Sequence, residues 1–202
     1  QCASARFDVS RDPALSSVVV QTNKLLSNRG IELVFLFCGN KWYFGETRAV
    51  QPFAEFSLRD YGRPMRDSRS GMIPPKLARI MINLARAPKN GVILDPFCGS
   101  GTILQEALLM GYSNVIGSDN SQKAINDTKI NFAWLKKNAP NAHIADPRLI
   151  LSDVRLLAKT LPAREVNAIV TEPYLGSPLK SGNHKNEMND LEKLYCERIA
   201  EC

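Results

Sequence analysis

One stretch limits the possible folds more than any other: residues 92–102, which read Val-Ile-Leu-Asp-Pro-Phe-Cys-Gly-Ser-Gly-Thr. The apolar run Val92–Leu94 predicts a buried strand, and the segment Thr102–Met110 predicts a helix directly after the loop. Between them, Gly99 and Gly101 let the backbone turn tightly and approach a ligand with no Cβ in the way. Because open α/β sheets bind ligands at the carboxyl ends of their strands, this loop predicts a ligand site.

Strand and helix patterns alternate through the rest of the chain, which predicts an α/β fold with a parallel sheet and flanking helices. A helix opens at Pro74-Pro75, and another follows Ser121, which is placed to cap it. Upstream, Gly39-Asn40 predicts a hairpin turn between two short strands. The predicted strands are Ile31–Phe37, Lys41–Gly45, Val92–Leu94, Asn114–Ser118, Arg148–Leu151 and Val166–Val170.

Composition excludes several classes of protein. The 202 residues are 44% hydrophobic and 23% charged, which is ordinary for a globular chain and excludes a disordered one. No apolar run approaches the roughly 20 residues that span a bilayer, so no membrane association is expected. Five cysteines without a CxxC pair and two isolated histidines predict free thiols in a reducing cytoplasm and no metal site. Since the chain opens on Gln1 without a targeting segment, it is expected to be part of a longer protein.

The positive charge of the chain is concentrated in one segment, Arg59–Lys89. It holds eight basic residues against two acidic ones, so its net charge of +6 equals that of the whole chain. Clustered positive charge attracts nucleic acid, because each neutralised phosphate releases condensed counterions. Arg63, Arg66 and Arg69 are the predicted RNA-binding residues, and a solvated helix face with a basic loop is the alternative.

Acidic residues follow three further predicted strands. Asp119 comes 24 positions after Asp95, at the next strand end, where a carboxylate commonly holds ribose hydroxyls. Asp153 follows the strand after that and suits either an adenine amino group or a helix N-cap. Glu172 follows Val166–Val170 and is placed to accept hydrogen bonds from an exocyclic amine, with Tyr174 to stack on a base.

Together these elements resemble the class I S-adenosylmethionine-dependent methyltransferases, and more narrowly the archaeal THUMP-containing tRNA guanosine N2-methyltransferase family. The resemblance rests on residues 95–102 and on the preceding stretch Gly71–Arg79, and it covers Ile31 to Gly176. It implies a Rossmann-like class I methyltransferase sheet, incomplete at its C-terminus and preceded by a small β-hairpin segment. Residues 1–58 would be a connecting segment that remains from a THUMP-linked region, and residues 59–202 the methyltransferase domain.

The resemblance also implies roles for individual residues. Gly99 and Gly101 would lie under the cofactor, Asp95 near its amino group, Asp119 on its ribose and Asp153 near its adenine. The implied catalytic residues are Glu172, Pro173 and Tyr174. The implied cofactor-binding residues are Asp95, Pro96, Cys98, Gly99, Ser100, Gly101, Thr102, Asp119, Asn120, Asp153 and Val154.

The fourth motif departs from the family pattern of Asp or Asn, Pro, Pro and an aromatic residue. Aligned on the strand and on Gly176, Glu172 takes the acidic place, Tyr174 the second proline and Leu175 the aromatic place. An alternative alignment matches Tyr174 to the aromatic residue and leaves Thr171 in the acidic place.

The resulting hypothesis is methyl transfer from S-adenosylmethionine to an exocyclic amino group of a nucleobase in RNA, with guanine N2 in tRNA as the favoured target. The alternatives are a DNA amino-methyltransferase and a non-catalytic RNA-binding protein that has kept the fold. A nicotinamide-dependent oxidoreductase is disfavoured, because the loop lacks the third glycine of the GxGxxG pattern. The expected location is cytoplasmic, the expected partner is tRNA, and the sequence leaves room for a small activating subunit.

Overall fold

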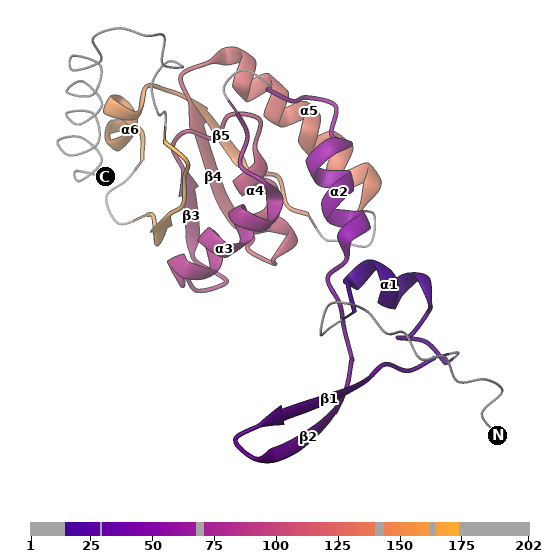
Figure 1. Ribbon diagram of the computed structural model, residues 1–202. Coiled ribbons are helices and arrows are strands. Elements are labelled where there is room, and N and C mark those ends of the chain that lie inside the picture. The colour runs from indigo at the N-terminus through magenta and orange to yellow at the C-terminus, as the bar shows by residue number, and fades with distance from the viewer. Residues whose placement is uncertain (1–14, 29, 68–70, 140–143, 162–164, 174–202) are drawn as a thin grey trace, which may run out of the picture. The chain divides into compact units, whose positions relative to one another are not determined.

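The computed structural model describes residues 15–28, 30–67, 71–139, 144–161 and 165–173, and Figure 1 shows its elements. The chain divides into two compact units, Gln1–Ser57 and Leu58–Cys202. None of the described helices is both long and apolar enough to cross a membrane. The connecting role predicted for residues 1–58 stays a prediction.

The first unit contains helix α1 (Ser17–Thr22) and a hairpin of strands β1 (Leu33–Cys38) and β2 (Lys41–Glu46). The strands are antiparallel, as predicted. Gly39 and Asn40 have φ angles of 55° and 61°, the left-handed conformation that a tight two-residue hairpin turn requires. Cross-strand aromatic pairs, Phe35 with Phe44 and Phe37 with Trp42, fix the register.

Helix α2 (Phe53–Tyr61) links the two units along the chain, and the sequence analysis did not predict it. Its last turn includes Arg59, the first residue of the basic segment Arg59–Lys89. The helix presents Arg59 inward, and Arg59 is the helix's one buried residue. A charged residue on the inward side of a helix interrupts the apolar pattern by which a surface helix is recognised.

The second unit is built on a four-stranded parallel sheet, which confirms the predicted fold class. Its strands lie in the order β5-β4-β3-β6. The strand bounds are β3 (Val92–Asp95), β4 (Asn114–Asp119), β5 (Arg148–Leu151) and β6 (Ala168–Ile169). The helices are α3 (Pro75–Ala85), α4 (Thr102–Leu109), α5 (Gln122–Asn138) and α6 (Val154–Thr160), of which α6 was not predicted.

The two faces of the sheet contribute to separate apolar cores. Ile93 of β3 packs into the core that contains buried residues of α3, α4 and α5, whereas the next residue, Leu94, packs with Leu157 of α6. Val115 and Ile116 of β4 divide in the same way, because successive strand residues point to opposite faces. Figure 1 shows α6 on one side of the sheet and α4 and α5 on the other.

The strand order places a topological switch point between β3 and β6. From β3 the chain moves outward to β4 and β5, and it then returns to the other side of β3 as β6. The carboxyl ends of β3 and β6 are therefore adjacent, and helix α4 after β3 and helix α6 before β6 pack on opposite faces of the sheet. In open α/β sheets this crevice is where ligands bind.

Candidate functional site

Three acidic residues follow neighbouring strands at the carboxyl edge of the sheet. Asp95 ends β3, Asp119 ends β4, and Glu172 follows β6. Burial is the main cause of the raised pKa of Asp95, and the charges of Asp119 and Glu172 raise it further, so each of these two groups lies within electrostatic reach of Asp95. Such a cluster favours a cationic ligand and opposes a pyrophosphate.

Asp95 forms the floor of this site. It is 2% exposed, and its Oδ1 accepts hydrogen bonds from the Thr171 hydroxyl at 2.7 Å and from the Phe97 amide at 3.2 Å. Burial raises the pKa of Asp95 to about 7, although both hydrogen bonds act in the opposite direction. The bond to Thr171 crosses the switch point and joins the loop after β3 to the loop after β6.

Asp119 holds two loops through its two oxygens. Oδ2 accepts from the Gly99 amide at 3.0 Å, and Oδ1 accepts from the Ser121 amide at 2.9 Å. The following residue, Asn120, is exposed. Asp119 therefore fixes the position of the glycine loop and the start of α5, beside its predicted role toward a ribose.

The two loop glycines have different environments. A Cβ built on Gly99, where φ is +52°, would meet nothing within 4 Å, so this position faces open space. A Cβ on Gly101, where φ is +87°, would lie 2.9 Å from Cγ2 of Thr128. The expectation that Gly101 leaves room for a ligand is therefore corrected, because the absent side chain leaves room for helix α5.

The other loop residues predicted to bind the cofactor are buried. The Cys98 amide donates to the Ser118 carbonyl at 2.8 Å, and burial raises the pKa of the Cys98 thiol well above its usual range. Pro96, Ser100 and Thr102 are buried, and Thr102 begins α4. These buried residues therefore contribute to the conformation of the loop.

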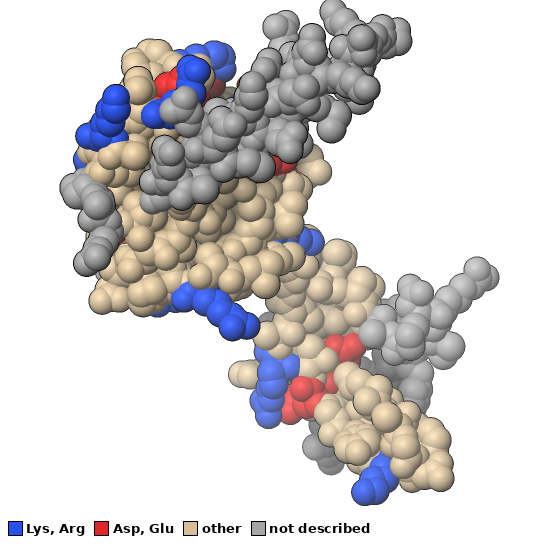
Figure 2. Space-filling view, turned by 90° about the vertical axis from the view of Figure 1, so that its left-hand side faces the viewer, with Lys and Arg blue, Asp and Glu red and all other residues tan. Residues whose placement is uncertain are grey.

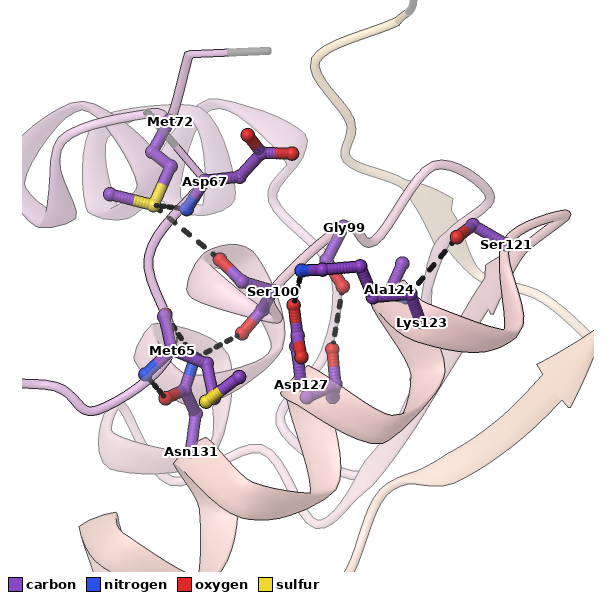
Figure 3. A network of polar contacts seen from close by, with 11 residues as sticks. Met65, Asp67, Met72, Gly99, Ser100, Ser121, Lys123, Ala124, Asp127 and Asn131 are labelled. Carbon is purple, nitrogen blue, oxygen red and sulfur yellow. Dashed lines mark hydrogen bonds and ion pairs between the residues drawn. The ribbon is translucent and has the colours of Figure 1, made fainter. Parts of the chain in front are cut away.

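Helix α5 braces the loop through two polar residues that the sequence analysis did not single out (Figure 3). The Thr128 hydroxyl donates to the Gly99 carbonyl at 2.7 Å, and the Asn131 amide group donates to the Ser100 carbonyl at 2.9 Å. Both side chains are fully buried. The sequence did carry a signal for Thr128 and Asn131, because these polar residues lie among the apolar positions Ile125 and Phe132 on the inward side of the helix.

Asp153 takes one of the two roles that the sequence left open for it, that of a helix N-cap. It caps α6, accepting from the Arg155 amide at 2.9 Å and pairing with the Arg155 guanidinium. These hydrogen bonds lower the pKa of Asp153 to about 2. The next residue, Val154, is buried in the first turn of the helix. The predicted contact of Asp153 and Val154 with adenine stays a prediction.

The motif after β6 presents a carboxylate outward. Glu172 is exposed and Pro173 is half-buried, whereas Tyr174 lies outside the described residues. The hydroxyl of Thr171 is taken up by Asp95. Of the two acidic-place candidates, Glu172 is therefore the exposed one.

The predicted RNA-binding residues of the basic segment Arg59–Lys89 differ in their exposure. Arg63 is 3% exposed, so the expectation that it faces RNA is corrected: its Nη1 donates to Oγ1 of Thr102 at 2.5 Å. Arg66 is exposed and lies over the Tyr61 ring, and its RNA-binding role stays a prediction. Arg69 lies outside the described residues. On the face shown in Figure 2, Lys and Arg side chains stand in separate groups.

Two more arginines of this segment are used inside the domain. Glu106 of α4 is 1% exposed and accepts from Nε of Arg59 and from Nε of Arg79, each at 2.6 Å. A buried carboxylate of this kind is tolerated because both of its oxygens are paired. Part of the charge that suggested a surface patch is thus neutralised in the interior.

Comparison with known proteins identifies the family. The family described as "RMKL-like, methyltransferase domain" matches residues 63–199, which is more than half of the chain. This chain belongs to the RMKL-like methyltransferase family. The match confirms the methyltransferase resemblance that the sequence predicted, and the matched residues of the RMKL-like domain include all three carboxylates of the switch point.

Curated relatives are similar over different lengths. The tRNA (guanine(10)-N2)-dimethyltransferase of Methanocaldococcus jannaschii is 31% identical over 192 residues, covering 95% of this chain and 49% of that protein. The probable tRNA (guanine(10)-N2)-dimethyltransferase of Methanothermococcus thermolithotrophicus is 37% identical over 118 residues, covering 57% of this chain and 70% of that protein. The chain spans half or less of the first curated relatives that it matches.

A solved structure, TrmN from Thermus thermophilus, is 23% identical with a TM-score of 0.46, covering 78% of this chain and 44% of that chain.

Proposed function

We propose that this chain transfers a methyl group from S-adenosylmethionine to an exocyclic amino group of a nucleobase in RNA, with guanine N2 in tRNA as the favoured target. The observation that carries the proposal is that Asp95, Asp119 and Glu172 follow adjacent parallel strands, which brings three carboxyl groups to one edge of the sheet beside the glycine loop. The relatives named as tRNA guanine-N2 methyltransferases support the choice of amine and of RNA.

The residues at the switch point fit S-adenosylmethionine, which supplies a methyl group on a positively charged sulfur. Asp95 and Asp119 place carboxyl groups at the ends of β3 and β4, and Glu172 places one after β6. Gly99 faces open space, which lets the ligand lie against the backbone of the loop. The same carboxylates would repel the pyrophosphate of a dinucleotide, so the cluster favours the sulfonium cofactor.

Glu172 is the proposed catalytic residue. An aromatic amine becomes positively charged as its nitrogen forms a bond to the methyl carbon, and a nearby carboxylate stabilises that charge. Glu172 is exposed, and its carboxylate accepts hydrogen bonds only, so it can orient the two N–H groups of an amine. The Pro173 carbonyl is the proposed second acceptor, and Tyr174 the proposed wall of the base pocket.

Positioning supplies the rest of the rate enhancement. Holding the amine in line with the methyl–sulfur bond can contribute several kcal/mol, about 7–11 in well-oriented intramolecular reactions. A base inside a duplex must be flipped out to reach such a site. Once the nitrogen carries the methyl group, its proton is acidic and leaves to water or to Glu172.

Transfer of a tritium-labelled methyl group to tRNA transcripts tests this function. The wild-type protein should label guanosine-containing RNA, and RNA with inosine at the modified position should stay unlabelled because inosine lacks the N2 amine. Glu172→Gln should reduce transfer by about 100-fold or more, as expected for the loss of one transition-state contact.

Glu165→Gln is the matched control for that variant. Glu165 precedes β6 at the opposite end of the strand and pairs with Arg148 at 3.1 Å, far along the sheet from the switch point. It should transfer methyl groups at the wild-type rate. Wild-type transfer by Glu172→Gln would remove Glu172 from the chemistry, and binding of RNA without any transfer would favour a non-catalytic RNA-binding protein.

A further inference from the structure

Arg63 has an environment that a surface arginine does not have. Its guanidinium donates through Nη1 to Oγ1 of Thr102 at 2.5 Å and through Nη2 to Sδ of Met72 at 3.2 Å. Its Nε is buried and has no hydrogen-bond partner among the described residues. Thr102 directly follows Gly101, so the guanidinium reaches the end of the loop at the switch point.

Burying this charge is unfavourable, which makes its retention informative. Burial lowers the pKa of Arg63, and the neighbouring charge of Arg66 acts in the same direction, while Asp60 and Glu106 act against them. Because arginine stays charged in proteins, the cost of desolvation falls on the folded state. An apolar side chain could fill this space equally well, so what arginine adds at this position is its hydrogen bond to Thr102.

A second contact fixes the same segment on the other side of the loop. The Met65 amide donates to Oδ1 of Asn131 at 3.0 Å, and Nδ2 of Asn131 donates to the Met65 carbonyl and to the Ser100 carbonyl, each at 2.9 Å. Figure 3 shows Asn131 between Met65 and Ser100. The segment that begins at Arg63 is therefore tied to the loop at two points, Ser100 and Thr102.

We propose that Arg63 is a positioning residue for the cofactor loop, and that it fixes Thr102 so that Gly99 presents its open side to S-adenosylmethionine. This inference rests on the proposed function and assigns Arg63 to the cofactor site instead of the RNA surface. Arg63 acts through Thr102 and needs no contact with the cofactor itself.

Calorimetric titration with S-adenosylmethionine tests the inference in matched pairs of variants of the purified protein. Thr102→Val removes the hydroxyl and keeps the volume, whereas Thr102→Ser keeps the hydroxyl. The valine variant should bind S-adenosylmethionine at least about tenfold more weakly. A displacement of about 1 Å in the groups that position a substrate can cost an enzyme about 100-fold in rate. The serine variant should bind like the wild type, and Arg63→Met should match the valine variant.

Two controls separate positioning from loss of stability and from RNA binding. Ile82→Val, in the buried face of α3, removes one buried methyl group and no hydrogen bond of the loop, so it should lower stability and keep wild-type affinity. Arg63→Met should leave the salt dependence of tRNA binding unchanged, whereas Arg66→Met should lower its slope by about 0.7–0.9 if Arg66 contacts one phosphate. In steady state, Thr102→Val should raise the KM for S-adenosylmethionine and leave the KM for tRNA unchanged.

Equal affinity of the valine and serine variants would overturn the inference while the proposed function stands, provided that the wild-type protein binds S-adenosylmethionine. A lower salt slope for Arg63→Met would also overturn it, because Arg63 would then contact phosphate. Absence of S-adenosylmethionine binding by the wild-type protein would refute the proposed function and this inference with it. If Arg63→Met does not fold, the Thr102 pair alone decides.

Discussion

Alanine at Gly99 should mainly weaken ligand binding, whereas alanine at Gly101 should mainly lower the stability of the fold. Both glycines have positive φ, at +52° and +87°, so each alanine costs about 1–2 kcal/mol of backbone strain. At Gly101 the new Cβ would also lie 2.9 Å from Cγ2 and 3.1 Å from Oγ1 of Thr128, and overpacking of this kind costs a further ~1–3 kcal/mol.

Gly101→Ala should therefore lower the free energy of unfolding by about 2–5 kcal/mol, and Gly99→Ala by about 1–2 kcal/mol. Urea unfolding followed by circular dichroism measures both values. Gly99→Ala should nevertheless weaken S-adenosylmethionine binding more, because its Cβ enters the open space beside the loop.

A double-mutant cycle with Thr128→Ser isolates the steric part of the effect. Serine removes Cγ2 and keeps the hydroxyl that donates to the Gly99 carbonyl. The pair Gly101→Ala and Thr128→Ser should show favourable coupling of about 0.5–3 kcal/mol, as for residues in contact. Equal destabilisation by the two alanines with no coupling to Thr128 would refute the assignment of Gly101 to helix packing.

Two further perturbations test the buried charges. Asp95→Asn should flatten the pH dependence of stability. Burial raises the pKa of Asp95 to about 7, so the folded wild-type protein keeps a proton that the unfolded chain releases from about pH 4. The stability of the wild-type protein should therefore fall by up to about 4 kcal/mol as the pH rises toward 7. Urea unfolding at pH 4.5 and pH 8 measures this, and parallel profiles for the two proteins would contradict it. Glu106→Gln should cost about 3–5 kcal/mol, because Arg59 and Arg79 lose their shared charge partner, and a thermal midpoint near that of the wild type would contradict it.

The fold could be predicted where local pattern decides it. Strands β3, β4 and β5 came within a residue of their observed bounds, because short apolar runs there end at Gly, Pro or acidic residues. Strand β6 covers only Ala168–Ile169 of the predicted Val166–Val170, since pairing to β3 stops after two residues. Helix α6 has seven residues, too few for its periodicity to stand out.

The sequence could not show which arginines form contacts inside the domain and which face solvent. Arg59 lies 47 positions before its partner Glu106, and Arg63 lies 39 positions before Thr102. Local charge density is the same whether an arginine faces phosphate or a buried carboxylate. The three strand-end carboxylates could be placed together, by contrast, because parallel strands end at a common edge.

The central claim is that the carboxylates of the switch point form a site for S-adenosylmethionine, and calorimetric titration of the purified protein tests it most directly. We expect saturable binding of S-adenosylmethionine and none of NAD, whose pyrophosphate the cluster of Asp95, Asp119 and Glu172 should repel. Saturable binding of NAD, or no binding of S-adenosylmethionine, would contradict the account.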